Sequence, residues 1–253
     1  TWFSEVGTQV GTKLSGPEAV RQHLKLDPAK PTAVLFSHIF WDATFFYGTD
    51  LFADYRVWYQ ETLKVARDKP ELNWLVKVHP ANLVKLRREG YQGELAEIQA
   101  LREVLGDPLP PHIQLILPDS PISTYSLFGV TDYAITVRGT VGIEAAALGR
   151  RVVTAGTGRY DRHGFTTDFD SKEAYLAQLR TLETLAPMSP QEHELGQKYA
   201  FGTFVLRPFD LRGISLTYGR DALATPRVRC HLKSVGDWLT NSDTTAFATW
   251  LLD

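Results

Sequence analysis

The sequence predicts an α/β fold, a doubly wound parallel sheet of the Rossmann type flanked by helices. Between residues 32 and 207, short apolar runs rich in β-branched residues alternate with stretches of helical periodicity. Glycine and polar residues gather directly after the apolar runs. The 253 residues are 43% hydrophobic and 22% charged, which is typical of a globular protein and excludes a disordered or collagen-like chain.

Five strands are predicted from continuous apolar runs of the kind that a parallel sheet buries on both faces. The first reads TAVLFS, and the second, NWLVKV, is ended by His79-Pro80. The strands are expected at residues 32–37, 73–78, 113–117, 133–137 and 152–155.

Helices are predicted where apolar side chains recur at helical spacing, as they do over residues 54–68. Gly149 stands where a helix over 141–148 would end. The helices are expected at residues 17–26, 54–68, 83–88, 94–105, 123–128, 141–148, 171–184, 190–206 and 244–252. Right-handed crossovers then place helices on both faces of the sheet.

Three parts of the chain are expected. Residues 1–31 are polar and are interpreted as an entry segment or the remnant of a preceding domain. Residues 32–207 form the Rossmann-like domain. Residues 208–253 lose the alternation and are interpreted as a C-terminal helical tail.

Charge and cysteine content restrict the partners. The chain has 27 basic and 29 acidic residues, so its charge gives no reason to expect nucleic acid binding. Its single cysteine, Cys230, excludes an intrachain disulfide, and no histidine spacing indicates a metal site. No signal peptide or long apolar run is visible, so a cytoplasmic location is expected, with peripheral association at the inner face of the membrane compatible with it.

The loop after the fourth strand carries the clearest binding signal. Arg138, Gly139 and Thr140 lead directly into a helix, whose first amides and positive dipole end favour a phosphate or diphosphate. Gly142 permits close approach, and Glu144, one turn further, suits the two hydroxyls of a ribose. The alternative is a threonine cap, a glutamate that stabilises the helix dipole and a solvated arginine.

Two further residues are candidates for catalysis. His79 stands at the end of the second strand, where it could donate to a phosphate or act as general acid toward it; the alternative is a buried histidine bonded to a carbonyl. Asp42 lies in an aromatic loop, where it could serve as a base. A cap of the following helix, or a hinge role, is the interpretation that the residues alone favour for Asp42.

Four separated motifs occur over about residues 32–182. The longest reads TVGIEAAALGRRVV from Thr140 and is followed by GRYD and GFT. The others are FWDA from Phe40 and VHPA from Val78. In sequence and in order these motifs resemble the capsule polysaccharide biosynthesis family, which includes bacterial transferases of Kdo (3-deoxy-octulosonic acid).

The resemblance implies a metal-independent GT-B glycosyltransferase, in which two Rossmann-like domains face a cleft and the carboxyl-terminal one binds a nucleotide-sugar. No cofactor is expected, and a CMP-sugar is favoured over a UDP-sugar. By resemblance, His79, Gly139 and Thr140 contact phosphate, Glu144 holds ribose, and Ser123 and Thr124 lie near the base. Asp119, Tyr160 and Asp161, which follow the third and fifth strands, complete the predicted donor-binding set.

The chain departs from the family pattern in two places: Gly139 stands where serine is usual, and Arg151 replaces a proline. Because 253 residues are too few for two such domains, we expect an N-terminal acceptor domain to be missing from this sequence. The expected function is transfer of Kdo or a related acidic sugar to a bacterial surface polysaccharide or glycolipid. The alternatives are a sugar-nucleotide epimerase and a non-catalytic nucleotide-sugar-binding module.

Overall fold

The computed structural model describes residues 14, 16–40, 50–82, 90–207, 212–217 and 227–252. The chain divides into two units, which are described separately. The larger is Gly11–Ala200, and the described part of the smaller one lies within Phe201–Asp253.

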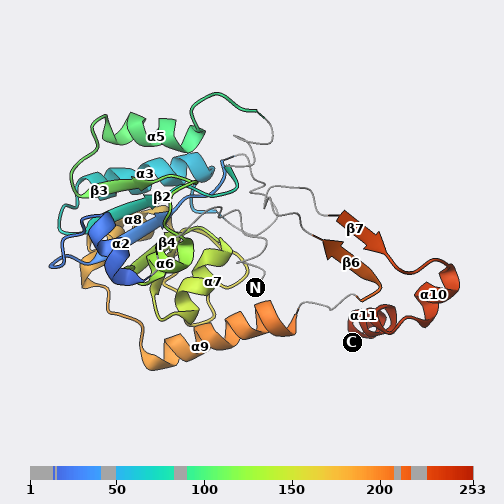
Figure 1. Ribbon diagram of the computed structural model, residues 1–253. Helices are drawn as coiled ribbons and strands as arrows, with labels where there is room; N and C mark the ends of the chain where they lie inside the picture. The colour runs from blue at the N-terminus through green and yellow to red at the C-terminus, as the bar shows by residue number, and fades with distance from the viewer. Residues whose placement is uncertain are drawn as a thin grey trace. The chain divides into compact units, whose positions relative to one another are not determined.

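A five-stranded parallel sheet, with the order β3-β2-β1-β4-β5, forms the centre of the larger unit (Figure 1). The strands are β1 (Thr32–Phe36), β2 (Asn73–Lys77), β3 (Ile113–Ile116), β4 (Tyr133–Thr136) and β5 (Arg151–Thr154). In register, Ala33 of β1 faces Trp74 of β2 on one side and Tyr133 of β4 on the other. The predicted doubly wound fold is therefore confirmed, and its topological switch point lies between β1 and β4.

Helices cover both faces of this sheet (Figure 1). On one face, α3 (Tyr55–Arg67) packs against α5 (Ala96–Leu105) and α8 (Lys172–Arg180). On the other face lie α6 (Thr124–Phe128), which contacts α2 (Pro17–His23), and α7 (Thr140–Ala147). Right-handed crossovers require this division, because the chain reverses its direction across the sheet after β3.

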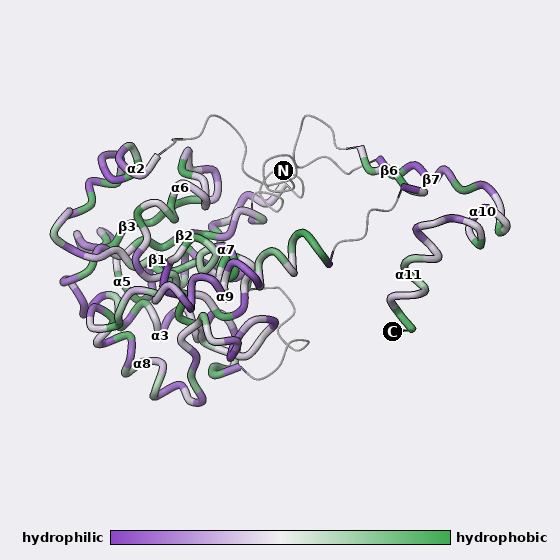
Figure 2. The backbone as a smooth tube through the Cα atoms, turned by 90° about the horizontal axis from the view of Figure 1, so that it is seen from below, coloured by the Kyte–Doolittle hydropathy of each residue, from purple (hydrophilic) through white to green (hydrophobic). Residues whose placement is uncertain are grey.

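The core depends on the alternation of strand side chains. On the α3 face, the buried set includes Leu35, Trp74 and Ile135 together with apolar residues of α3, α5 and α8. On the other face, Phe36 packs against Phe128 of α6, with ring centroids 5.9 Å apart. In Figure 2, hydrophobic stretches run along the central strands.

Several predicted helices have different bounds from those expected. The predicted helix over 171–184 is α8 followed by a separate 3₁₀ turn, η1 (Leu182–Thr184). The predicted helix over 190–206 is α9 (Pro190–Phe201), which passes into a π-helical turn, η2 (Gly202–Leu206). The predicted helix over 83–88 lies outside the described residues.

The two ends of the chain also differ from the prediction. Leu14 forms a parallel bridge with Ile122, and α2 contacts α6, so residues 14–31 belong to the unit that holds the sheet. The smaller unit is not only helical: β6 (Ile214–Thr217) pairs with β7 (Arg227–Cys230) in an antiparallel hairpin before α10 (Val235–Thr240) and α11 (Ser242–Leu252). Both strands are largely exposed, so neither carries the continuous apolar run that identified the other strands. Within the described residues, no helix is both long and apolar enough to cross a membrane.

Candidate functional site

The candidate site lies at the carboxyl ends of β1, β2 and β4, where a doubly wound sheet binds its ligands. His38 follows β1, His79 follows β2, and Arg138 and Gly139 follow β4. The ends of β1 and β2 are linked because the Ser37 hydroxyl accepts a hydrogen bond from the His79 amide at 3.1 Å. The structure thus brings His79 and the β4–α7 turn, which the sequence predicted separately, to the same edge of the sheet.

The start of α7 offers free amides. Gly139 is its N-cap and supplies no side-chain cap, while Thr140 is exposed at the first helical position. The Gly139 amide is 3.4 Å from the Thr136 hydroxyl, and the Gly142 amide donates to the Gly139 carbonyl at 2.9 Å. The first amides of a helix have no acceptor within it, so the amides at Thr140 and after it suit an anion.

Glu144 lies one turn into α7 and is half-buried. Burial raises the pKa of its carboxyl to about 7, although a hydrogen bond from the Thr140 hydroxyl acts in the opposite direction. At neutral pH the group is therefore near the midpoint of its titration. It can accept hydrogen bonds from a diol when ionised and loses part of that capacity when protonated.

Arg138 is buried rather than open to solvent. Its guanidinium forms an ion pair with Asp50, and 5% of its side chain is exposed. Burial lowers the pKa of Arg138, and the nearby Asp161 opposes that change. The loop after β5 covers it closely: a Cβ on Gly156 would lie 3.3 Å from its Nη2, and one on Gly158 would lie 2.9 Å from its Cβ. In this structure the Arg138 side chain is therefore not open to the predicted phosphate contact.

Tyr160 and Asp161 form hydrogen bonds with the backbone of the loops around the site. Tyr160 is 2% exposed, and its hydroxyl donates to the Gly139 carbonyl at 2.7 Å. Gly142 is required there, since an added Cβ would lie 2.7 Å from the Tyr160 Cζ. Asp161 accepts a hydrogen bond from the Gly158 amide at 2.5 Å. In this structure both residues hold neighbouring backbone, which differs from the ligand contact predicted for them.

His79 has a defined hydrogen-bond role. Its Nδ1 accepts from the Ala81 amide at 3.1 Å, so in the neutral ring the proton is on Nε2. The ring is half-buried. That tautomer has its N–H on the nitrogen that a donating or acidic histidine would use.

Three predicted donor-binding residues, of which Ser123 and Thr124 were expected near the base, lie further along the sheet, beyond the end of β3. Asp119 is exposed, and Thr124 begins α6. Ser123 caps that helix: its hydroxyl accepts from the Ser126 amide at 2.9 Å. Since β2 and β1 separate β3 from β4, the carboxyl ends of β3 and β4 are on the order of 14 Å apart, at about 4.8 Å per strand. Asp42 lies outside the described residues.

The sequence reasoning missed His38. It was grouped with histidines that lack ligand spacing, yet its Nε2 lies 3.2 Å from the Val137 amide and 3.1 Å from the Thr136 hydroxyl. The available signal was its position: it follows the strand that the fold places beside β4.

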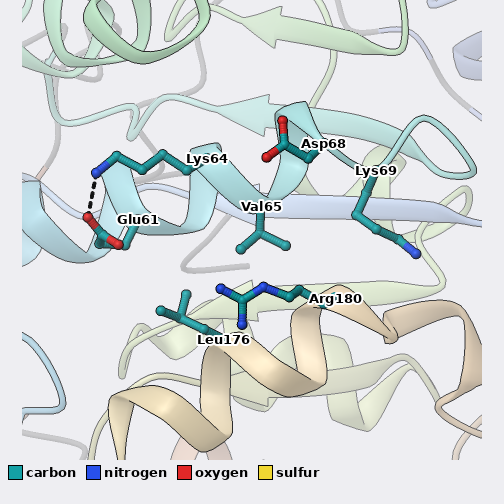
Figure 3. A pocket seen from close by; sticks show the side chains of 7 residues that line it. All are labelled: Glu61, Lys64, Val65, Asp68, Lys69, Leu176 and Arg180. Atoms are coloured by element: carbon teal, nitrogen blue, oxygen red, sulfur yellow. Dashed lines mark hydrogen bonds and ion pairs between the residues drawn. The ribbon is translucent and has the colours of Figure 1, made fainter.

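A hollow in the surface lies at the opposite end of the sheet from the candidate site. It has a volume of about 450 Å³ and lies between α3 and α8 (Figure 3). Its charged walls are partly paired, with Lys64 2.6 Å from Glu61 and Lys69 2.7 Å from Glu183. Because α3 ends there and leads into the start of β2, this hollow is at the amino ends of the strands and away from the candidate site.

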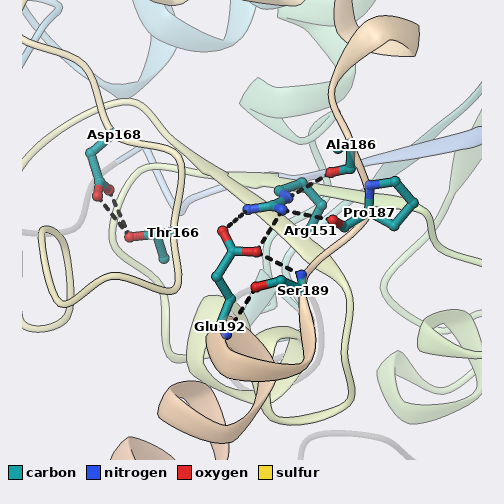
Figure 4. Close-up of polar contacts among 7 residues, drawn as sticks. All are labelled: Arg151, Thr166, Asp168, Ala186, Pro187, Ser189 and Glu192. Atoms are coloured by element: carbon teal, nitrogen blue, oxygen red, sulfur yellow. Dashed lines mark hydrogen bonds and ion pairs between the residues drawn. The ribbon is translucent and has the colours of Figure 1, made fainter.

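Arg151, which replaces the usual proline, is a structural anchor (Figure 4). Its guanidinium binds both carboxylate oxygens of Glu192, at 2.6 and 2.9 Å, and donates to the carbonyls of Ala186 and Pro187. Arg151 lowers the pKa of the Glu192 carboxyl to about 2. This set of bonds holds the start of α9 beside β5.

Over the residues that the structure describes, no group of three or more histidine, cysteine, aspartate or glutamate side chains is placed to hold a metal ion.

The family comparison covers most of the larger unit. The model of the family described as "Capsule polysaccharide biosynthesis protein" matches residues 10–187. No curated protein matches the chain.

The chain matches 42 chains of solved structures with a similar fold. A glycosyltransferase from Rickettsia africae ESF-5 is 12% identical with a TM-score of 0.44, covering 74% of this chain and 45% of that one. The KpsC beta Kdo 2,4 transferase of Thermosulfurimonas dismutans is 17% identical with a TM-score of 0.41, covering 74% and 48%. A putative UDP-N-acetylglucosamine 2-epimerase from Listeria monocytogenes is 15% identical with a TM-score of 0.44, covering 75% and 43%.

This chain therefore spans less than half the length of each of these three proteins. The family model, in contrast, matches well over half of the chain and includes the β4–α7 turn, His79 and the loop after β5. The resemblance seen in the sequence motifs is confirmed, and the chain belongs to the capsule polysaccharide biosynthesis protein family.

Proposed function

We propose that this chain is the donor-binding part of a GT-B glycosyltransferase that acts in bacterial surface polysaccharide synthesis. The observation that carries the proposal is an uncapped helix start and a half-buried carboxyl beside the switch point of the sheet, with His79 after β2 at the same edge. An anion is favoured at Gly139 and Thr140, and a diol at Glu144. A nucleotide-sugar contains both groups, a phosphate and a ribose.

In the proposed reaction the sugar leaves a nucleotide phosphate, on which negative charge develops. The amides at the start of α7 would face that charge together with the Thr140 hydroxyl. His79 would donate from Nε2, because Nδ1 is already the acceptor of the Ala81 amide. Helix amides and an imidazole provide this stabilisation without a metal ion, so the proposed transfer is metal-independent.

The finer assignments rest on the family. We propose a CMP-sugar rather than a UDP-sugar as donor, with Kdo or a related acidic sugar transferred to a polysaccharide or glycolipid acceptor. The acceptor would bind to a further domain of the full protein, acting at the inner face of the membrane. Ser123 and Thr124, beyond β3, are the proposed contacts of the base, and Asp119 is a further proposed donor-binding residue.

Nucleotide binding tests the proposal directly. Thermal unfolding should be measured with CMP, UDP and the corresponding nucleotide-sugars, each with and without EDTA. We expect CMP and CMP-Kdo to raise the melting temperature, and EDTA to leave the increase unchanged. Failure of every nucleotide to bind would refute the proposed function, while binding that requires a divalent ion would refute metal-independent transfer.

Substitution of His79 tests its role against that of a structural histidine. The variant His79→Ala should lower transfer by about 10²–10⁴-fold, the range for a lost general acid, with a much smaller effect on folding. Activity is measured in the full protein, and the melting temperature of each variant is measured in parallel. His112→Ala is a matched control, since His112 also makes a part-buried hydrogen bond, at 3.0 Å to the Ala66 carbonyl, but lies away from the site. A collapse of the melting temperature in His79→Ala alone would instead identify a core histidine.

A further inference from the structure

His38 lies at the switch point and gathers several donors at a single nitrogen. Its Nε2 accepts from the Val137 amide at 3.2 Å and lies 3.4 Å from the Arg138 amide. The same nitrogen is 3.1 Å from the Thr136 hydroxyl, which in turn is 3.4 Å from the Gly139 amide. Every residue from Thr136 to Gly139 is therefore connected, directly or through Thr136, to this one imidazole.

This arrangement determines the protonation state of His38. An imidazole nitrogen that accepts from two amides carries no proton, so Thr136 must donate to it and the ring proton is on Nδ1. Burial, with His79 and Arg138 nearby, lowers the pKa of His38 to about 3. The ring stays neutral over the physiological range, which excludes it as a proton donor to the ligand through Nε2.

The ring is also fixed in position by aromatic contacts. It stacks on Tyr55, with centroids 4.3 Å apart, and meets the edge of Trp58 at 5.7 Å. Trp58 is itself held because its Nε1 donates to the Tyr175 hydroxyl at 2.9 Å. The acceptor nitrogen is thus attached to the core through α3, independently of β4 and α7.

We propose that His38 is a positioning residue for the anion site. By holding the turn between β4 and α7 at one fixed acceptor, it sets the direction in which the first amides of α7 face the ligand. The Val137 and Arg138 amides donate to His38, so the first amide that can donate to the ligand is that of Thr140. The identification of that ligand as a donor phosphate rests on the proposed function above.

Two substitutions at position 38 separate this role from simple packing. Glutamine places an acceptor oxygen near the position of Nε2, whereas methionine fills a similar space without a strong acceptor. Two variants, His38→Gln and His38→Met, are compared with the unmodified protein. The measurements are the dissociation constant for CMP by calorimetry and amide hydrogen exchange over residues 133–142.

We expect His38→Met to weaken CMP binding by about tenfold or more and to accelerate exchange at Val137 and Arg138, because two hydrogen bonds are lost. The rescuing variant His38→Gln should bind within about threefold of the unmodified protein and retain slow exchange at both amides. His112→Met is the matched control: its melting temperature should fall while its CMP affinity is unchanged.

A further variant tests the same contact in case His38→Met does not fold. Thr136→Val removes the hydroxyl that links Gly139 to His38 and keeps the side-chain shape, so it should weaken CMP binding in the same direction. Equal losses of affinity in His38→Gln and His38→Met, or an unchanged affinity in both His38→Met and Thr136→Val, would overturn the proposal. If the unmodified protein binds no nucleotide, the proposed function fails, and exchange at Val137 and Arg138, which needs no ligand, still decides whether His38 holds the turn.

Discussion

At Glu144 the surrounding protein changes the acidity of a side chain in the candidate site. Burial raises the pKa of its carboxyl to about 7, so ionisation takes place within the physiological range. If the carboxylate accepts hydrogen bonds from a ribose diol, nucleotide affinity should increase as pH rises from 6 to 8. Calorimetric titration of CMP across this range measures the effect, and the variant Glu144→Gln should keep only the pH dependence that the CMP phosphate contributes through its second pKa of about 6.

The same residue gives a second prediction, on ligand chemistry. Glu144→Gln should weaken binding of CMP, while 2′,3′-dideoxy-CMP, which lacks the diol, should bind both proteins with similar affinity. Equal losses for the two ligands would contradict the diol role.

The raised pKa of Glu144 also affects stability. The native state binds more protons than the unfolded state between pH 4.5 and 7, so the free energy of unfolding falls as pH rises through that window. Glu144→Gln should remove this dependence and stabilise the protein at pH 8 by up to about 3 kcal/mol. Denaturant unfolding at pH 5 and pH 8 tests the sign, and a variant that is less stable than the unmodified protein at pH 8 would contradict it.

At the scale of the elements, α9 is fixed to the sheet by Arg151 and Glu192. The pKa of the Glu192 carboxyl is lowered to about 2, so its contribution is present above pH 4.5 and is lost as pH falls toward 2. Arg151→Lys should cost about 3 kcal/mol of unfolding free energy, because a lysine cannot bind both carboxylate oxygens and two carbonyls in the same plane. Urea unfolding at pH 7 measures this loss.

The same helix provides the control. Glu194 pairs with Lys198 at 2.7 Å on the exposed side of α9, so Glu194→Gln should leave the stability nearly unchanged. In Glu192→Gln the unfolding free energy should depend less on pH below pH 4.5, whereas in Glu194→Gln this dependence should be the same as in the unmodified protein. If the two variants lost the same unfolding free energy at acid pH, the Arg151–Glu192 pair would contribute no more to stability than the exposed Glu194–Lys198 pair.

At the scale of the whole molecule, the site and the sheet belong to the larger unit, Gly11–Ala200. A chain that ends after Arg207 should therefore keep both a cooperative thermal transition and its affinity for CMP. Calorimetry of the shortened and full chains tests this. Loss of CMP affinity in a shortened chain that still folds would indicate that residues after Arg207 contribute to the site.

The five strands of the parallel sheet could be predicted from the sequence because continuous apolar runs and turn residues are local signals. The strands β6 and β7 could not, since exposed strands carry no such run. That His79 and Gly139 lie at the same edge of the sheet was also predictable, because each directly follows a strand and the strands are parallel. Two features could not be predicted: the buried pairing of Arg138 with Asp50 and the role of His38. Both depend on contacts between distant parts of the chain, which a local sequence pattern does not indicate.

The helix that carries the candidate site is held at both ends. At its carboxyl end, His193 of α9 binds the Ala147 carbonyl at 2.9 Å, and Gly196 lies so close that a Cβ would be 3.0 Å from the backbone of Ala146. At its amino end, the turn is attached to His38. The loss of conformational entropy for this region therefore belongs to folding rather than to ligand binding. A ligand that reaches α7 meets a preorganised surface, so differences in affinity between ligands reflect their fit to it and not the work of arranging it.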